Sequence, residues 1–505
     1  MSDAYRSFLE NLKRVPSAFV ESARRRGQAT SERDRSRAVF ANFFLHIHAV
    51  KTHKHSLKPC YTLGLGLLTA AFLAIVTLTG ILLMVYYKPT PALAYESIKD
   101  IHYVVPTGRM IRNLHRWAAH GMVIVVFLHM ARVFYTASYR RPREFNWFVG
   151  ILLFVLTLAL SFTGYLLPWD QLAFWAITIG ANIASSPQEL TDALGVTRLF
   201  DPGSMIRHLL LGANTVGAEA LIRFYLLHVM VLPIGLFVLL GTHFWRIRKD
   251  GGLSRPASAD AIEDSEVFVP SSSKTYGLMA VVRGRSEAVG KAPENTVNSW
   301  PRLFVAELAI LMLAVAVVLA LSLAIDAPLK EAANPAIPEN PAKAPWYFLG
   351  VQELVSYSAF MGGIVVPGIV LAGLILIPYL DREKQGVGVW CGGKQGRWVA
   401  LWSAVFAATF VIGSLVFIVN FGWLRAWYPD IPQIVITFFN PGAVFTFGFA
   451  VWSILVMRHY NSTRMGAIAV FTCFLVGYII LTYFGTVHRG PNWDFYWSQA
   501  NWPVH

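Results

Sequence analysis

The sequence predicts an all-α membrane protein that crosses the bilayer about nine times. Hydrophobic residues make up 55% of the 505-residue chain and charged residues only 14%, and the mean hydropathy is +0.49. A soluble core could not bury so much apolar surface, so lipid has to serve as part of the solvent. Backbone polar groups in lipid are satisfied within the segment, so the spans are expected to be helices.

Apolar segments of about 17 to 25 residues are long enough to span. They fall near residues 62–86, 112–136, 146–167, 222–246, 302–325, 363–380, 398–421, 435–457 and 465–485. The loop after every second segment carries Arg and Lys, at 140–143, 246–249, 382–397 and 458–464. Cytoplasmic loops concentrate these residues. We therefore expect a bacterial-type inner membrane location, a cytoplasmic N-terminus and a C-terminus outside.

The net charge of +14 does not predict nucleic-acid binding. Its cations lie in the N-terminal arm and in these alternate loops, so anionic lipid is the expected partner. The polar, Ser-rich stretch 251–299 reads as a cytoplasmic linker. The expected organisation is an arm (1–60), a four-helix unit (61–250), the linker (251–299), a three-helix unit (300–424), and two further spans with a Trp-rich outer tail (425–505).

Two of the spans each contain a pair of histidines. His115 and His129 are 14 residues apart, and His228 and His243 are 15 apart. A 14-residue step on a helix returns to within about 40° of the same face and rises about 21 Å, most of a roughly 30 Å hydrocarbon core. The 15-residue step leaves about 60°, which kinking or unwinding at Pro233 can absorb.

Histidines placed at two depths suit two haems, each held by two imidazoles. Such an iron is six-coordinate and suited to electron transfer, because no coordination position is left open. A single histidine inside a span more often packs or binds substrate, so the prediction rests on the two matched pairs. His120 is expected to pack or to form hydrogen bonds.

Glycines repeat the 14-residue spacing in two other spans, as Gly66 with Gly80 and Gly150 with Gly164. Glycine costs about 1 kcal/mol in a helix interior, so their register suggests that a porphyrin passes close to the backbone there. Ordinary helix packing is the alternative. Buried cations need partners, so haem propionates are expected near the arginines that flank the histidines, although these side chains could instead snorkel to the interface. These are Arg112, Arg116, Arg132 and Arg223.

Three sequence strings carry a family resemblance. NLHRWAAHGMVIVVFLHMARVFYTASYRRPREF, SFTGYLLPWDQLAFWA and RFYLLHVMVLPIGLFVLLGTHF resemble cytochrome b of the Rieske/cytochrome b complexes, over residues 60–255. The 15-residue histidine spacing is similar to the chloroplast and Firmicutes type. Residues from about Trp300 to Leu424 resemble the separate subunit IV of that type, here fused through the linker. The last two spans and the tail are expected to be accessory.

The resemblance implies a quinol:cytochrome c or plastocyanin oxidoreductase that translocates protons. His115 and His228 would hold one b-type haem near the outside, and His129 and His243 the other near the cytoplasm. Electrons would pass to a Rieske iron–sulfur protein with a c-type cytochrome, and through the haems to an inner quinone, in a homodimeric complex. The outer quinol site would be lined by Gly164, Tyr165, Pro168, Trp169, Asp170, Trp346 and Tyr347. The inner site is expected near Arg248, His53 and His55, and the alternative is that these basic residues contact lipid headgroups.

The outer-site loop departs from the family pattern. Where the family reads Pro-Glu-Trp-Tyr, this chain reads Ala344, Pro345, Trp346, Tyr347. The glutamate credited with taking a quinol proton is missing, yet deprotonation needs a base within hydrogen-bond reach. The hypothesis is that Glu353 substitutes, and the alternative is that it only packs or ends a helix.

Cys60 raises a second question. Some chloroplast-type complexes attach an extra haem to a cysteine near the first helical glycine. That position falls on Gly64, and Cys60 lies one turn earlier, so a third haem is the less favoured expectation. The three cysteines show no CxxC pattern and predict no disulfide framework.

Two other classes of protein stay open. A dihaem b membrane anchor of a quinone-linked dehydrogenase would also need two histidine pairs. It would not need the TGYLLPWDQ and PWYFLGVQEL segments. A membrane transporter is suggested only by nine spans with Gly and Pro interruptions.

Overall fold

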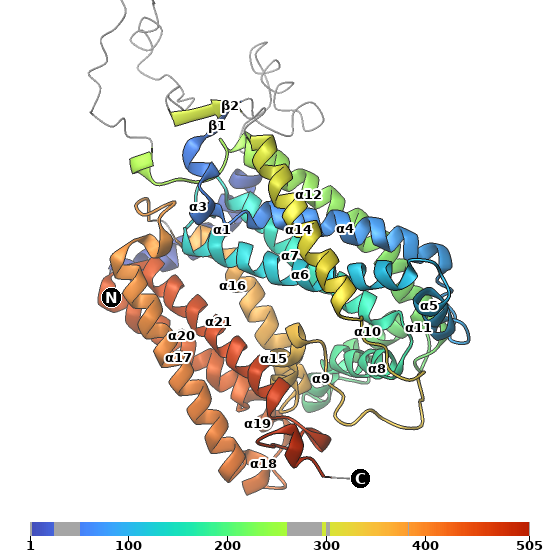
Figure 1. The fold of residues 1–505 in the computed structure, drawn as a ribbon. Helices are drawn as coiled ribbons and strands as arrows, with labels where there is room; N and C mark the ends of the chain where they lie inside the picture. The colour runs from blue at the N-terminus through green and yellow to red at the C-terminus, as the bar shows by residue number, and fades with distance from the viewer. Residues whose placement is uncertain (1–2, 25–50, 260–294, 299–302, 382, 504–505) are drawn as a thin grey trace, which may run out of the picture.

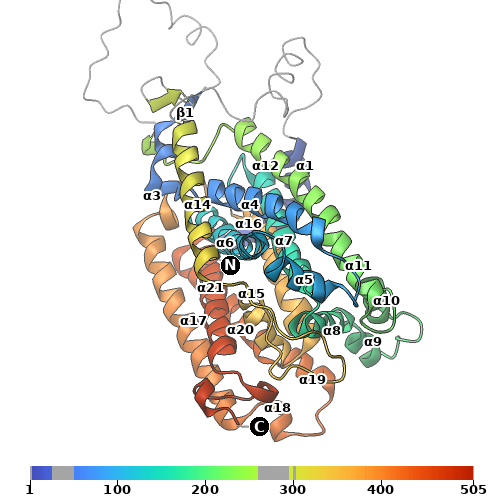
Figure 2. The ribbon, with the colours of Figure 1, turned by 45° about the vertical axis from the view of Figure 1, so that its right-hand side comes forward.

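The computed structural model describes residues 3–24, 51–259, 295–298, 303–381 and 383–503. Within these residues, nine helical segments are long and apolar enough to cross a membrane (Figures 1 and 2). The all-α, polytopic prediction is confirmed. The spans are α4 (Leu65–Tyr86), α6 (Gly108–Tyr135), α7 (Glu144–Leu166), α11 to α12 (Ala218–Leu226 and Leu232–Lys249), α14 (Phe304–Ala324), α16 (Val366–Leu380), α17 (Lys394–Phe421), α20 (Pro441–Tyr460) and α21 (Thr463–Val487).

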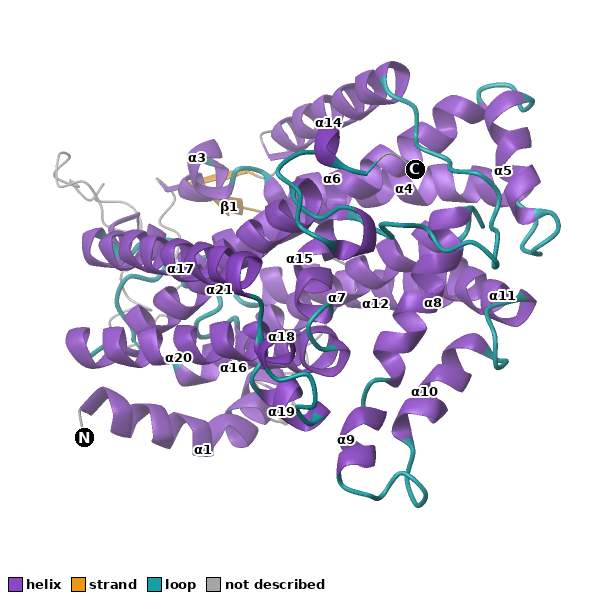
Figure 3. Cartoon of the chain, turned by 90° about the horizontal axis from the view of Figure 1, so that it is seen from below, coloured by secondary structure: helices purple, strands orange, loops and turns teal. Residues whose placement is uncertain are grey.

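Further helices lie before and between the spans. They are α1 (Asp3–Arg24), α3 (Pro59–Thr62), α5 (Ala94–Tyr103), α8 (Gln171–Ser185), α9 (Gln188–Ala193), α10 (Pro202–Leu211), α15 (Trp346–Val355), α18 (Leu424–Trp427) and α19 (Gln433–Phe438). Helix dominates the described chain (Figure 3). Among the described residues, one antiparallel pair of strands, β1 (Lys51–His53) and β2 (Thr296–Asn298), joins the arm to the end of the expected linker. Most of that linker, residues 260–294, lies outside the described residues.

The loops predicted to share one face meet at one end of the bundle, beneath α1. The Asn11 amide donates to the carbonyl of Leu380, at the end of α16, at 2.6 Å. Arg141, between α6 and α7, pairs with Glu21 at 2.9 Å. We call this the inner end, and the opposite end, which holds α5 and α8, the outer end. The sequence indicated only an arm where the structure has a 22-residue helix.

The last two spans are central to the C-terminal half. Helix α21 is the most buried of the spanning helices, and it packs against α15, α17 and α20 (Figure 1). It also reaches α6, where Phe471 stacks on Phe134 with ring centroids 3.9 Å apart. The hydroxyls of Thr472 and Tyr135 lie 2.9 Å apart. These helices therefore form part of the core that supports the N-terminal bundle.

Two spans contain a π turn just before a proline. The π turn η2 (Leu227–Val231) includes His228 and precedes Pro233, and η6 (Met361–Val365) precedes Pro367 in the same way. A π turn holds one residue more than an α turn. The 15 residues from His228 to His243 therefore cover the rotation that 14 residues cover in a regular helix. This is the unwinding expected near Pro233.

Candidate functional site

Each of the four histidines lies against one of the four glycines. Helix α4 supplies the glycines that face α6, and α7 supplies those that face η2 and α12. The ideal Cβ position of each glycine lies close to the Cε1 atom of its histidine: Gly80 and His115 at 3.2 Å, Gly66 and His129 at 3.3 Å, Gly164 and His228 at 2.5 Å, and Gly150 and His243 at 3.6 Å. The glycines thus make room for imidazole rings, where the sequence had suggested a porphyrin as the close neighbour.

The outer histidine pair has space for a metal ion between its rings. The ring centroids of His115 and His228 are 6.2 Å apart, and their planes cross at 73°. This separation leaves room for one metal ion at about 2 Å from a nitrogen of each ring. The rings come from α6 and η2, so two facing helices fix the pair.

Hydrogen bonds fix which nitrogen of the outer rings carries the hydrogen. The Thr79 hydroxyl donates to a carbonyl one turn earlier at 2.7 Å, so it accepts from Nδ1 of His115 at 3.0 Å. Nδ1 of His228 lies 3.1 Å from the carbonyl of Leu160, which can only accept, and 3.2 Å from the Thr163 hydroxyl. Both rings then present the Nε2 lone pair, the form that binds a metal.

The inner pair, His129 and His243, lies next to a buried arginine. Arg132, three residues after His129, is 5% exposed, and its guanidinium lies 4.5 Å from the centroid of the Tyr61 ring. Its Nη2 has no hydrogen-bond partner among the described residues. Buried polar groups normally have partners, and a carboxylate pairs well with guanidinium. Arg132 could therefore bind an acidic group of a cofactor held by the inner pair.

The other flanking arginines contact protein groups. Arg112 donates to the carbonyls of Ala327 and Pro328 at 2.9 and 2.7 Å. Arg223 donates to the carbonyl of Leu209. Arg116 donates from Nε to Nε2 of His120. The role expected for them beside haem propionates stays a prediction.

A polar and aromatic cluster forms where α6, α7 and α15 meet at the outer end. Trp346 donates from Nε1 to Nδ1 of His120 at 2.9 Å, and Tyr347 lies with its ring centroid 6.1 Å from that of His120. Arg116 donates to Nε2 of His120 at 2.9 Å and lies 5.6 Å from the centroid of the Tyr165 ring. Three residues predicted for the outer site thus come together. His120 was expected to pack or to form hydrogen bonds, and the structure shows the hydrogen bonds; a polar side chain four residues after Arg116 shares its helix face.

Asp170 joins two segments of the chain near this cluster. Its Oδ1 accepts from the backbone N–H of Ala173 at 2.9 Å and caps α8, and its Oδ2 accepts from the N–H of Lys330 at 3.0 Å. Burial raises the pKa of Asp170 above its ordinary value, although these two hydrogen bonds oppose the rise. The carboxylate joins the α7–α8 turn to the loop after α14.

Glu353 is fully buried on α15, and both of its oxygens are already occupied. Arg489 donates from Nε to Oε2 at 3.0 Å and from Nη2 to Oε1 at 2.6 Å. Trp493 and Tyr357 donate to the carboxylate at 3.1 and 3.2 Å. These contacts tie α15 to the segment after α21. They give Glu353 a structural role, and its role as a proton acceptor stays a prediction. The sequence offered no sign of a pair whose members are 136 residues apart.

Of the residues expected at an inner quinone site, His55 lies against Tyr61. The ring of His55 has its centroid 4.5 Å from that of Tyr61, and Nδ1 of His53 accepts from the N–H of His55 at 3.1 Å. Arg248 lies in the last turn of α12. Cys60, considered for a third haem, is exposed.

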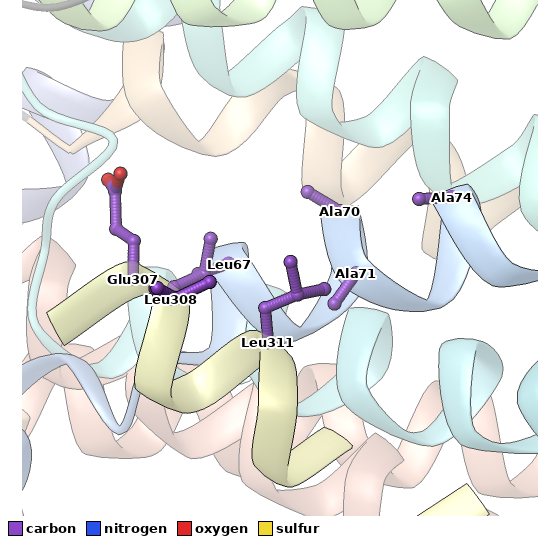
Figure 4. A pocket seen from close by; sticks show the side chains of 7 residues that line it. All are labelled: Leu67, Ala70, Ala71, Ala74, Glu307, Leu308 and Leu311. Carbon is purple, nitrogen blue, oxygen red and sulfur yellow. The ribbon is translucent and has the colours of Figure 1, made fainter. Parts of the chain in front are cut away.

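An apolar groove of about 300 Å³ separates α4 from α14 (Figure 4). Leu67, which follows Gly66, contributes to its wall, so the groove lies at the level of the inner histidine pair. The carboxylate at one end is that of Glu307. The lining residues are Leu67, Ala70, Ala71, Ala74, Glu307, Leu308 and Leu311.

Comparison with known proteins identifies the family. Residues 50–251 match the family described as Cytochrome b/b6/petB. Cytochrome b6 of Heliobacterium mobile is 47% identical over 197 residues, which cover 39% of this chain and 86% of that protein. The chain belongs to the cytochrome b family. Membership of this family implies haem binding.

Two further similarities extend the comparison. The menaquinol:cytochrome c reductase cytochrome b subunit of Bacillus subtilis (strain 168), in the same family, is 41% identical over 187 residues, or 37% of this chain and 78% of that protein. A solved structure described as hyperthermophilic respiratory Complex III has a TM-score of 0.58 and 22% identity, over 90% of this chain and 97% of that chain. The sequence similarity to the cytochrome b family lies in the N-terminal half, and the similarity of fold includes the C-terminal half.

Proposed function

We propose that the chain is the catalytic membrane subunit of a quinol:cytochrome c-type oxidoreductase. The observation that carries the proposal is the set of four histidines, paired at two depths, each against its own glycine. The named relatives support it, because they include a menaquinol:cytochrome c reductase subunit. When bound, two b-type haems would supply one-electron carriage between the two ends of the bundle.

The residues present fit two such groups. His115 and His228 would hold the outer haem, since their hydrogen bonds leave Nε2 as the metal-binding atom. His129 and His243 would hold the inner haem, and Nη2 of Arg132, which has no hydrogen-bond partner in the described part of the chain, would bind a propionate beside it. A glycine lies behind each ring, and the contact is closest at Gly164, where a Cβ would come within 2.5 Å of the His228 ring.

Quinol would be oxidised in the cluster between α6, α7 and α15. Tyr165, Trp346 and Tyr347 supply aromatic faces for a planar ring, and their neighbours supply polar groups to orient hydroxyls. A dihaem anchor has no need of this cluster, so the cluster favours the oxidoreductase. A Rieske iron–sulfur protein would take one electron and a c-type cytochrome would receive it, in a homodimeric complex.

A second quinone would be reduced near the inner pair. The groove between α4 and α14 offers apolar room for a hydrocarbon tail (Figure 4), and His53, His55 and Arg248 lie at the same end of the bundle. This end would face the cytoplasm, because the basic loops gather there.

A redox titration of the purified complex tests the proposal. The reduced-minus-oxidised spectrum is expected to show b-type bands with two midpoint potentials. Adding an oxidant in the presence of quinol should transiently reduce haem b, and an outer-site inhibitor should block that reduction. A transporter would show no b-type bands. A dihaem anchor would show the bands without the oxidant-induced reduction.

A further inference from the structure

We infer that His120 accepts the proton of the quinol hydroxyl at the outer site and so does the work of the missing glutamate. The inference rests on the proposed function and names a catalytic residue within it. Three observations carry it: the position of the ring, the donors that face it, and the occupation of the nearby carboxylates by other groups.

The imidazole of His120 lies beside the loop position where the family has its glutamate. Pro345 stands at that position, and it immediately precedes α15. The next residue, Trp346, donates to His120 at 2.9 Å, and the ring of Tyr347 lies against the same imidazole. A base on α6 therefore lies next to the position, just before α15, where the family has its carboxylate.

Both ring nitrogens of His120 face permanent donors. Arg116 Nε–H points at Nε2 and Trp346 Nε1–H points at Nδ1, and neither donor group can accept. A neutral imidazole has only one nitrogen with a free lone pair. Protonation would place an N–H opposite each donor and a second cation beside Arg116. The site therefore holds the ring neutral, as a base must be, and would not retain the imidazolium.

The carboxylates predicted for the outer site are occupied. Glu353 receives four hydrogen bonds, two of them from Arg489. Asp170 receives backbone N–H groups on both oxygens. Proton acceptance by either would first break contacts that join separate parts of the fold, whereas His120 has to release only one competing donor.

The proposed step transfers one proton. The O–H bond of the quinol breaks, a new N–H bond forms on the His120 ring, and the electron pair of the O–H bond stays on the quinolate oxygen. The ring then turns away from Arg116 and releases the proton to the aqueous phase at the outer end. The iron–sulfur partner is the first one-electron oxidant of the quinolate. The charged or titratable groups against the ring are Arg116 on α6 and Tyr347 on α15, and Tyr165 on α7 lies against Arg116.

The test measures steady-state quinol oxidation by the purified complex between pH 5 and 9, with duroquinol and menadiol as probes. His120→Gln replaces the imidazole by a polar side chain of similar size that cannot accept the proton. We expect kcat to fall by about 10²- to 10⁴-fold, the range of general base catalysis, with KM nearly unchanged and both b-type bands retained. The acid limb of the pH profile should disappear. His208→Gln, on the exposed surface of α10, is the matched control and should behave as the wild type.

Two further variants keep the proposal testable if His120→Gln assembles poorly. Adding Pro345→Glu to His120→Gln restores a carboxylate at the family position and should recover at least a tenth of the wild-type kcat. Trp346→Phe removes one competing donor, so the imidazolium is better tolerated and the acid limb should move to higher pH.

The outcomes separate this inference from the proposed function. If the wild type shows oxidant-induced reduction of haem b but His120→Gln keeps its kcat and pH profile, the role of His120 is overturned while the function stands. The role is also overturned if Glu353→Gln, and not His120→Gln, removes the acid limb. A wild type without oxidant-induced reduction overturns both.

Discussion

Arg489 holds the carboxylate of Glu353 with two hydrogen bonds, and the pair lies almost entirely out of solvent. The side chains are 11% and 0% exposed. Arg489 follows α21, whereas Glu353 lies on α15, so the ion pair fastens the end of the last span to the helix that begins with Trp346. Because α15 forms one wall of the proposed quinol site, the C-terminal segment sets the position of that wall.

Breaking this pair from one side should be strongly destabilising. Arg489→Gln would leave a buried carboxylate without its cation, which typically costs about 3–5 kcal/mol. We expect a clearly lower midpoint of thermal unfolding, followed by circular dichroism of the solubilised complex. The double variant Glu353→Gln, Arg489→Gln should recover part of the loss. Lys330→Gln breaks the exposed pair with Glu339 and should change little. Equal midpoints for the single and double variants would contradict this account.

The glycine behind His228 should tolerate no larger residue. A Cβ at Gly164 would lie 2.5 Å from Cε1 of His228, whereas one at Gly150 would lie 3.6 Å from that of His243, an ordinary contact. Gly164→Ala is therefore expected to displace the ring and remove or shift one of the two b-type components in a redox titration. Gly150→Ala is the control and should keep both. Identical spectra for the two variants would show that the ring contact has no bearing on the haem.

Thr79 should tune the potential of the outer haem. Its hydroxyl accepts from Nδ1 of His115, which strengthens the ring as a ligand for oxidised iron. Thr79→Val removes the acceptor, so the midpoint potential should rise. A hydrogen bond worth about 1 kcal/mol corresponds to about 40 mV for one electron. The Thr77 hydroxyl donates a hydrogen bond to the carbonyl of Leu73 and has no other side-chain hydrogen bond within the described residues. Thr77→Val should therefore leave both midpoint potentials unchanged.

Asp326 should make the outer end sensitive to acid. Hydrogen bonds from Arg109 and Asn113 lower the pKa of Asp326 from 3.8 to about 2. A carboxyl group whose pKa is depressed by folding adds stability above its unfolded pKa, and that stability is lost as the pH falls from about 3.8 toward 2. Asp326→Asn should therefore lower the unfolding midpoint at pH 7, and the difference from wild type should shrink below pH 4. A difference that does not change with pH would exclude the ionised carboxylate as its source.

The spans and the histidine pairs could be predicted from the sequence because lipid imposes them. Length and apolarity mark a span whatever its neighbours are, and helical period alone places His115 and His129 on one face. The extra residue before His243 was correctly assigned to unwinding near Pro233, since proline lacks the N–H that a regular turn needs.

Contacts between distant spans could not be predicted in this way. His120 meets Trp346 across 226 residues, and lipid-compatible composition does not say which helices are neighbours. For the same reason, the sequence did not predict the contact between Arg489 and Glu353. It also made α20 and α21 look accessory, because the resemblance ended before them, although α21 is the most buried span.

Because of the π turn around His228, the number of residues between His228 and His243 does not by itself fix their relative positions in the membrane. One residue can be lost from Leu227–Val231 by converting the π turn to an α turn, without rotating His243 away from α7. A deletion in α12, after Pro233, removes a residue from a regular helix. It would rotate His243 about the helix axis by about 100°. Loss or gain of a single residue should therefore be tolerated at this turn of the helix and not at the others, so a histidine spacing of 14 here would serve the same two depths as the present spacing of 15.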